Sequence, residues 1–199
     1  MTVEQIYQSF LDFIAAYGYI AVAVLMAMEN ACIPIPSELI LGFAGYLIFA
    51  DQMTFTGAMT AGMIGGMAGS IFAYLVGSYG GRTFVDKYGK YFLIKKSHVD
   101  LAQRWFDKYG IRAVFFSRML PVVRTFISLP AGFARVNFKA FMFYTFAGSL
   151  PWTALILWLG LFFGENWKKL LEIGHEFSLI VVIALVIAVA FYIYKRRKK

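Results

Sequence analysis

The sequence predicts an all-α integral membrane protein built as an inverted repeat. In this arrangement a re-entrant helical hairpin plus a transmembrane helix occurs twice in opposite orientation, and one further C-terminal transmembrane helix follows. Of 199 residues, 60% are hydrophobic and 15% charged, whereas soluble domains are about 45–50% apolar and about 25% charged. Two apolar stretches, residues 28–38 and 116–125, contain prolines and charges. The length favours a single membrane domain spanning residues 1–199.

The N-terminal segment, residues 1–15, is predicted to be an amphipathic helix. Val3, Ile6, Phe10 and Ile14 recur at helical spacing, with polar residues between them. Such a pattern is typical of a helix that lies at the membrane interface. An extension of the next helix fits the same pattern equally well.

Residues 18–50 are predicted to form the first re-entrant hairpin. Glu29 and Glu38 are nine positions apart, so a single helix would place them on opposite faces and expose one of them to lipid. Pro34 and Pro36 would also interrupt the hydrogen bonds of that helix. Two half-helices with both glutamates near the tip avoid both problems. Non-helical backbone at this depth must be surrounded by protein or by a wet cavity.

Residues 53–79 are predicted to be a transmembrane helix, and residues 80–110 a basic cytoplasmic segment. The helix carries a row of small residues at every fourth position: Gly57, Ala61, Gly65, Gly69, Ala73 and Gly77. Small residues allow two helices to approach closely. The row fits an ordinary packing face, and it also fits a surface along which a mobile hairpin slides.

Residues 111–134 are predicted to form the second re-entrant hairpin. Arg118 and Arg124 are six positions apart, or about 120° around a helix, so a break is needed for them to converge. Pro121, which lies between them, and Pro130 are the candidate breaks.

The remaining chain supplies two further transmembrane helices, residues 138–163 and 177–194, and a basic tail, residues 195–199. The first Lys or Arg of the sequence is Arg82. Because basic loops stay in the cytoplasm, the tail and the 80–110 segment are both predicted inside. The C-terminus is therefore cytoplasmic, and the two hairpins enter from opposite sides of the membrane.

Local echoes between the two halves support this repeat. Tyr17-Gly18 precedes the first hairpin, and Tyr109-Gly110 precedes the second. Inverted repeats with broken helices place a substrate site near the middle of the bilayer, between the two repeats.

The four buried charges are the candidate site. An ionisable side chain at the bilayer centre costs roughly 2.5–3.5 kcal/mol on insertion scales, so such residues are paired, hydrated or functional. Arg118 and Arg124 would bind a phosphate group, since guanidinium forks match phosphate oxygens. Glu29 and Glu38 would pair with the arginines or carry protons. A fixed ionic cluster that only joins the two hairpins is the structural alternative.

Other classes find less support in the sequence. The lone cysteine, Cys32, excludes an intramolecular disulfide, and no metal-binding motif or cofactor is indicated. His98 and His175 lie outside the apolar segments, so no general base is expected at the charged site and the protein is not expected to be an enzyme. Nucleic acid is not expected as a partner, because the basic residues fit cytoplasmic loops.

Several spaced motifs resemble the DedA family, relatives of the VTT-domain scramblases. They cover about residues 10–165: Glu29, Pro34, Pro36 and Glu38; Tyr74, Gly77, Gly80, Gly81 and Arg82; Phe116, Arg118, Pro121, Arg124 and Thr125. The resemblance implies a bacterial inner-membrane transporter of undecaprenyl phosphate or a phospholipid. It also implies that the family's acidic pair corresponds to Glu29 and Glu38, and its arginine pair to Arg118 and Arg124.

The sequence and the resemblance together predict a flippase- or scramblase-type lipid transporter whose partner is a lipid with a phosphate headgroup. Protonation of a glutamate would release an arginine for the substrate, which makes proton coupling part of the hypothesis. A proton-coupled small-ion carrier or channel is the alternative. The lipid carried, the coupling ion and homo-oligomerisation are left open by the sequence.

Overall fold

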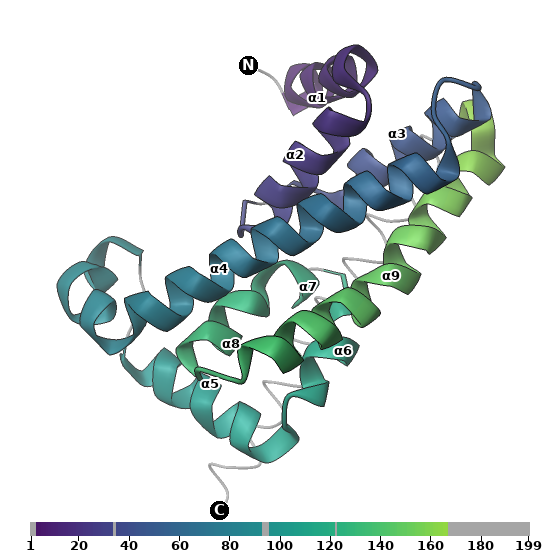
Figure 1. The fold of residues 1–199 in the computed structure, drawn as a ribbon. Coiled ribbons are helices and arrows are strands. Elements are labelled where there is room, and N and C mark those ends of the chain that lie inside the picture. Colours follow the sequence, from purple (N-terminus) through teal and green to yellow (C-terminus); the bar gives the residue numbers. More distant parts are fainter. Residues whose placement is uncertain (1–2, 34, 93–95, 122, 167–199) are drawn as a thin grey trace, which may run out of the picture.

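The computed structural model describes residues 3–33, 35–92, 96–121 and 123–166, and in these ranges all regular structure is helical (Figure 1). The predicted segments 177–194 and 195–199, and Pro34 of the first break, lie outside the described residues. The elements in chain order are α1 (Val3–Tyr17), α2 (Tyr19–Asn30), α3 (Ser37–Phe49), α4 (Phe55–Phe92), α5 (Lys96–Tyr109), α6 (Arg112–Arg118), α7 (Val123–Phe126), α8 (Ser128–Phe133), α9 (Phe138–Phe163) and a 3-10 turn, η1 (Gly164–Asn166).

Two of these helices are long and apolar enough to cross a membrane. The apolar part of α4, Phe55–Tyr79, has 25 residues, and α9 with its terminal turn, Phe138–Asn166, has 29. At 1.5 Å per residue both exceed the roughly 30 Å of a hydrocarbon core. Helix α4 continues to Phe92. The first part of the expected basic segment, residues 80–110, is therefore an extension of this helix.

The short helices pack on the two long ones. Helix α2 lies along α4, and α3 lies along α9; farther along the chain, α6 packs on α9 and α8 on α4. Figure 1 shows α4 and α9 as the two long rods of the molecule, with α7 and α8 near its middle. Each long helix therefore has its main contacts with one helix from each broken segment.

Two glycine pairs allow close backbone contact at two of these crossings. A Cβ atom on Gly160 would lie 3.0 Å from the Cα atom of Gly45, where α3 meets α9. A Cβ atom on Gly132 would lie 2.9 Å from the Cα atom of Gly77, where α8 meets α4. Because backbone atoms cannot move aside as a side chain can, these crossings require glycine.

The apolar core has two parts. The first joins α1–α3 to the beginning of α4 and the end of α9, and it includes Ile14, which is fully buried. The second joins the later part of α4 to α5, α6, α8 and the beginning of α9, and it is centred on Tyr74 and Phe141. The part of α4 that faces the first core ends at Ala61, and Tyr74 belongs to the second core. Ser70 lies between these two positions. Polar side chains gather at this boundary.

Two glycines mark the entry to the broken segments. Gly18 has φ of 55° and separates α1 from α2, and Gly110 has φ of 70° and follows α5. Positive φ is readily accessible to glycine and costly for most other residues. Because of Gly18, α1 is a helix distinct from α2 rather than its extension.

Candidate functional site

Both broken segments bring their charges to one buried cluster. Helix α2 ends at Glu29 and Asn30, and α6 ends at Arg118; α7 carries Arg124 and Thr125. The side chains of Glu29, Arg118 and Arg124 are only 2%, 0% and 2% exposed. Three ionisable groups buried this deeply need polar partners, and the pattern of those partners differs between the two arginines.

Arg118 is held by uncharged side chains. Its Nη1 donates to Asn30 Oδ1 at 2.6 Å, and its Nη2 donates to Ser70 Oγ at 2.8 Å and to Ser128 Oγ at 2.6 Å. These acceptors come from α2, α4 and α8. Only Nε of this guanidinium has no hydrogen-bond partner among the described residues. We refer to Asn30, Ser70 and Ser128 as the neutral clamp.

Glu29 is the acceptor that connects the two broken segments. Its Oε1 accepts from the Thr125 hydroxyl at 2.8 Å, and its Oε2 accepts from the Asn30 amide at 2.6 Å. Oε2 also lies 3.6 Å from Arg124 Nη2, which makes an ion pair between two buried groups. Glu29 thus contacts Arg124 directly and reaches Arg118 only through Asn30.

Arg124 has spare hydrogen-bonding capacity. Its Nε and Nη1 atoms are buried and have no hydrogen-bond partner in the described part of the chain. Its guanidinium carbon lies 5.4 Å from the ring centre of Trp152 on α9, within the range of a cation–π contact. A guanidinium forms up to five hydrogen bonds, so Arg124 keeps donor capacity that no described residue uses.

Glu38 lies in the first turn of α3 and is partly buried, but it forms no ion pair with any residue that the structure describes. The Ser37 hydroxyl is 3.4 Å from its Oε2 atom. Trp152 Nε1 is 3.4 Å from the same hydroxyl oxygen. Trp152 therefore connects the Arg124 side of the cluster with the Glu38 side.

The predicted breaks lie beside these charges. Pro36 precedes α3 with φ of −65° and ψ of 121°, an extended conformation that a proline favours. Pro121 is buried between α6 and α7, and its carbonyl accepts from the Val123 amide at 2.7 Å. Because α2 and α6 end here, their last residues, Asn30 and Arg118, lie close enough to form a hydrogen bond.

The sequence alone gave no role in the site to five side chains of the cluster. Asn30 directly follows Glu29. A second polar residue within an apolar stretch could have indicated that Asn30 belongs to the site. Ser70 stands in a glycine-rich row, where serine reads as a small packing residue. The other three are Thr125, Ser128 and Trp152.

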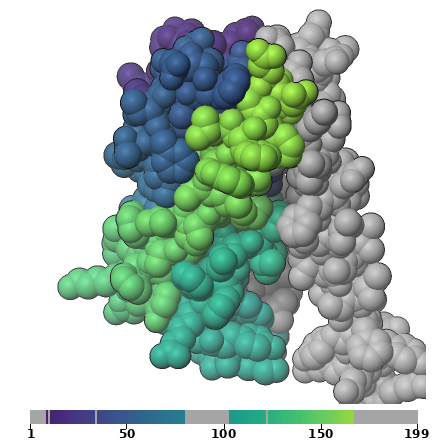
Figure 2. All heavy atoms as spheres, turned by 90° about the vertical axis from the view of Figure 1, so that its right-hand side faces the viewer, coloured from purple at the N-terminus to yellow at the C-terminus, as the bar shows by residue number. Residues whose placement is uncertain are grey.

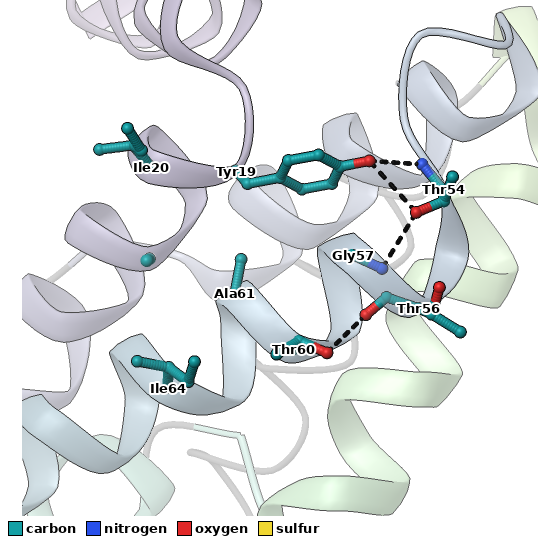
Figure 3. Close-up of a pocket in the computed structure, with 9 residues that line it drawn as sticks. Tyr19, Ile20, Thr54, Thr56, Gly57, Thr60, Ala61 and Ile64 are labelled. Atoms are coloured by element: carbon teal, nitrogen blue, oxygen red, sulfur yellow. Dashed lines mark hydrogen bonds between the residues drawn. The ribbon is translucent and has the colours of Figure 1, made fainter.

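A separate groove lies between the beginning of α2 and the beginning of α4 (Figure 3). Its volume is about 560 Å³, and no charged residue lines it. Tyr19 closes one side, since its hydroxyl accepts from the Thr54 amide at 2.8 Å. Ala23 and Ile64, at the far end, precede Glu29 and Ser70 by six residues, or about 9 Å of helix. The groove is thus apolar and distinct from the charged cluster.

This combination defines a class: a helical membrane protein with two helices able to cross the bilayer and a buried polar site assembled from two broken segments. The comparison with known families makes the class specific. The model of the VTT domain matches residues 35–162. The chain belongs to this family, the VTT or DedA family of membrane proteins.

Two similar proteins carry a transporter name. Undecaprenyl phosphate transporter A of Bacillus subtilis (strain 168) is 40% identical over 188 residues, covering 94% of this chain and 93% of that protein. The protein of the same name from Staphylococcus aureus (strain NCTC 8325 / PS 47) is 31% identical over 199 residues, covering 96% and 98%. A third relative, from Lactococcus lactis subsp. lactis (strain IL1403), is named alkaline phosphatase-like protein and is 33% identical over 189 residues, covering 90% and 88%. No solved structure matches the chain.

Proposed function

We propose that this protein carries a phosphate-bearing lipid, such as undecaprenyl phosphate or a phospholipid, across the bacterial inner membrane as a flippase- or scramblase-type transporter. The observation that carries the proposal is the state of Arg124. Its guanidinium is 2% exposed, and two of its three nitrogens lack a hydrogen-bond partner among the described residues. A phosphate group would supply those acceptors in a bidentate arrangement.

Charge balance in the cluster supports an anionic ligand. Among the described residues, Glu29 is the one carboxylate that forms an ion pair with an arginine of the cluster, Arg124, whereas Arg118 has neutral acceptors. Glu38 accepts a hydrogen bond from Ser37 and has no ion pair in the described part of the chain. A buried group with an excess of positive charge is stabilised when an anion enters. The names of the two undecaprenyl phosphate transporters among its relatives agree with a lipid phosphate as that anion.

The proposal includes the two re-entrant hairpins and the inverted repeat. If the two repeats are related by symmetry, α4 of the first repeat corresponds to α9 of the second. The contact of α2 with α4 then corresponds to that of α6 with α9, and the contact of α3 with α9 to that of α8 with α4. The glycine contacts follow the same exchange, as Gly45–Gly160 corresponds to Gly77–Gly132. Both observations support an alternating-access movement of one repeat against the other.

Single-cysteine labelling tests the predicted topology in a Cys32→Ala background. Cysteines at Ser9 and Asp51 should react with a membrane-impermeant reagent from outside, whereas cysteines at Ser97 and Lys199 should react only from inside. The cysteine-free parent is the control. Labelling of positions 9 and 51 from opposite sides would contradict the first re-entrant hairpin, because residues 18–50 would then span the membrane.

We also assign proton coupling or charge pairing to Glu29 and Glu38, since each carboxylate can lose its charge while the arginines remain cationic. With both changed to Gln, transport should lose its pH dependence in vesicles of fixed lipid composition. An unchanged rate and pH profile in the double variant would remove the acidic pair from the mechanism.

The test of the function is lipid-phosphate movement by the purified full-length chain in proteoliposomes. Arg124→Lys keeps the charge but loses the planar fork, so transport should fall at least about tenfold, the loss of roughly one charged hydrogen bond. Arg112→Lys, at the exposed start of α6, is the matched control and should transport normally. A fully active Arg124→Lys would refute phosphate binding by the fork.

The same vesicles separate the alternatives. Ion flux without lipid movement would favour a proton-coupled small-ion carrier or channel. Release of inorganic phosphate from the lipid would favour an enzyme, as the name of the Lactococcus relative suggests for that protein. The proposal expects lipid movement with the phosphate still attached.

A further inference from the structure

The two arginines of the cluster differ in how completely their hydrogen bonds are satisfied. Arg118 donates three bonds of 2.6–2.8 Å to the neutral clamp. Arg124 makes one ion-pair contact at 3.6 Å, and its Nε and Nη1 have no partner in the described part of the chain. Both side chains are buried to the same degree, so exposure does not explain the difference.

We propose that the two arginines have separate tasks. Arg118 is a positioning residue that fastens both broken segments to α4 through the neutral clamp, and Arg124 is the arginine that touches the phosphate. This inference rests on the proposed function, because it assigns parts within the same lipid-phosphate site.

The position of Asn30 fixes how the clamp works. Its amide nitrogen donates to Glu29 Oε2 at 2.6 Å and to the Met26 carbonyl at 3.0 Å. Since both of its N–H groups are committed there, its oxygen must face Arg118, where it accepts at 2.6 Å. Glu29 therefore orients the residue that holds Arg118.

The clamp joins distant parts of the chain. Arg118 on α6 is bonded to Asn30 on α2, which is 88 residues away, and to Ser70 on α4. The third acceptor, Ser128, begins α8. One side chain thus connects four helices, and these include the tips of both broken segments. A contact of this kind sets the positions of the segments relative to the span.

An uncharged clamp also keeps the positive charge of Arg118 in the site. Neutral acceptors satisfy the guanidinium N–H groups but do not cancel its charge. Arg118 would then raise the local potential for an anion bound at Arg124 without touching it. Binding of the phosphate to Arg118 itself would require displacement of acceptors at 2.6–2.8 Å, whereas Nε and Nη1 of Arg124 have no acceptor among the described residues.

Thermal unfolding of the full-length protein in detergent separates the two tasks. The probe is farnesyl phosphate, with farnesol as the uncharged control. Arg118→Gln should lower the unfolding temperature and should reduce the phosphate-dependent rise only in part, because it removes a nearby charge but no donor that touches the phosphate. Arg124→Gln should lose that rise, with affinity for farnesyl phosphate weakened at least about tenfold.

Milder variants test the clamp if Arg118→Gln fails to fold. Ser70→Ala and Ser128→Ala should leave the half-saturating lipid-phosphate concentration within about twofold in proteoliposomes, and they should lower the maximal rate per folded protein. Threonine at either position keeps the hydroxyl and should restore the rate. Ser149→Ala, a buried serine of α9 outside the cluster, is the matched control.

The outcomes are distinct. Equal loss of the phosphate effect in both arginine variants, or loss in Arg118→Gln alone, would overturn the division of tasks while leaving the proposed function intact. The division would also fail if the serine variants raised the half-saturating concentration as Arg124→Gln does. Absence of any phosphate effect in the wild-type protein would overturn the proposed function itself.

Discussion

The buried pair of Glu29 and Arg124 gives the sharpest test of how the cluster is assembled. The perturbation is a double-mutant cycle with Glu29→Gln, Arg124→Gln and the double variant. Glutamine keeps the size of each polar head and removes its charge. The cycle isolates the interaction between the two side chains from their other contacts.

The structure sets the size of the expected coupling. The two groups are 3.6 Å apart, and each is 2% exposed. At an effective dielectric constant of about 20, charges at that distance attract by nearly 5 kcal/mol, an upper limit that desolvation reduces. Glu29 also keeps its bonds to Thr125 and Asn30. We therefore expect a coupling energy of about 2–3 kcal/mol, within the range seen for contacting residues.

Equilibrium unfolding in mixed detergent micelles measures the four free energies. The parallel cycle of Glu38→Gln with Arg124→Gln is the control, because Glu38 has no ion pair among the described residues; it should give less than about 1 kcal/mol. A Glu29–Arg124 coupling below about 0.5 kcal/mol would refute the pairing. A larger coupling for Glu38 would reassign the partner.

Two further substitutions probe the packing around the site. Gly132→Ala places a methyl group 2.9 Å from the Cα atom of Gly77 and should lower the free energy of unfolding by about 1–3 kcal/mol, whereas Gly66→Ala, whose new atom meets nothing closer than 3.5 Å, should be neutral or stabilising. Trp152→Phe keeps a ring beside Arg124 but loses the hydrogen bond to Ser37. Its free energy of unfolding should therefore fall by about 0.5–1.5 kcal/mol. A larger fall than in Trp152→Ala would contradict these two contacts of Trp152.

The positions of the charges could be anticipated from the sequence because proline acts locally. A proline removes an amide donor and clashes with the preceding turn. Helix α2 ends at Asn30 and α3 begins at Ser37, on either side of the Pro34–Pro36 break. Pro121 similarly lies between the end of α6 and the start of α7. A proline ends a helix through its effect on the adjacent turn, so the position of a helix end can be predicted from the residues next to it.

The end of α4 was harder to place. The basic composition from residue 80 onward indicated the end of the helix near residue 79, yet α4 continues through Gly80 and Gly81 to Phe92. Each glycine weakens a helix by only about 1 kcal/mol. Since an existing helix adds each further residue without a new nucleation cost, such a penalty does not stop it.

The partners of the arginines depend on tertiary structure and could not be read from spacing. Arg118 is bonded to residues 88, 48 and 10 positions away. Ser70 looks like one more small residue in a packing row until α6 is placed beside it. Pairing by charge alone would match each arginine with a glutamate, and Arg118 instead takes neutral acceptors.

That choice of acceptors bears on whether the cluster is only a structural lock. A fixed ionic lock is most stable when every guanidinium is matched by a carboxylate and every donor has an acceptor, because unmatched buried charge is costly. Here Glu29 pairs with Arg124 and not with Arg118, and Nε and Nη1 of Arg124 are left without partners in the described part of the chain. In the proposed function, a bound phosphate would supply the acceptors that these donors lack. A site that holds one arginine firmly and leaves donors of the other without described partners is what the proposed function, binding and release of a phosphate, would require, and a permanent lock between two segments would not require it.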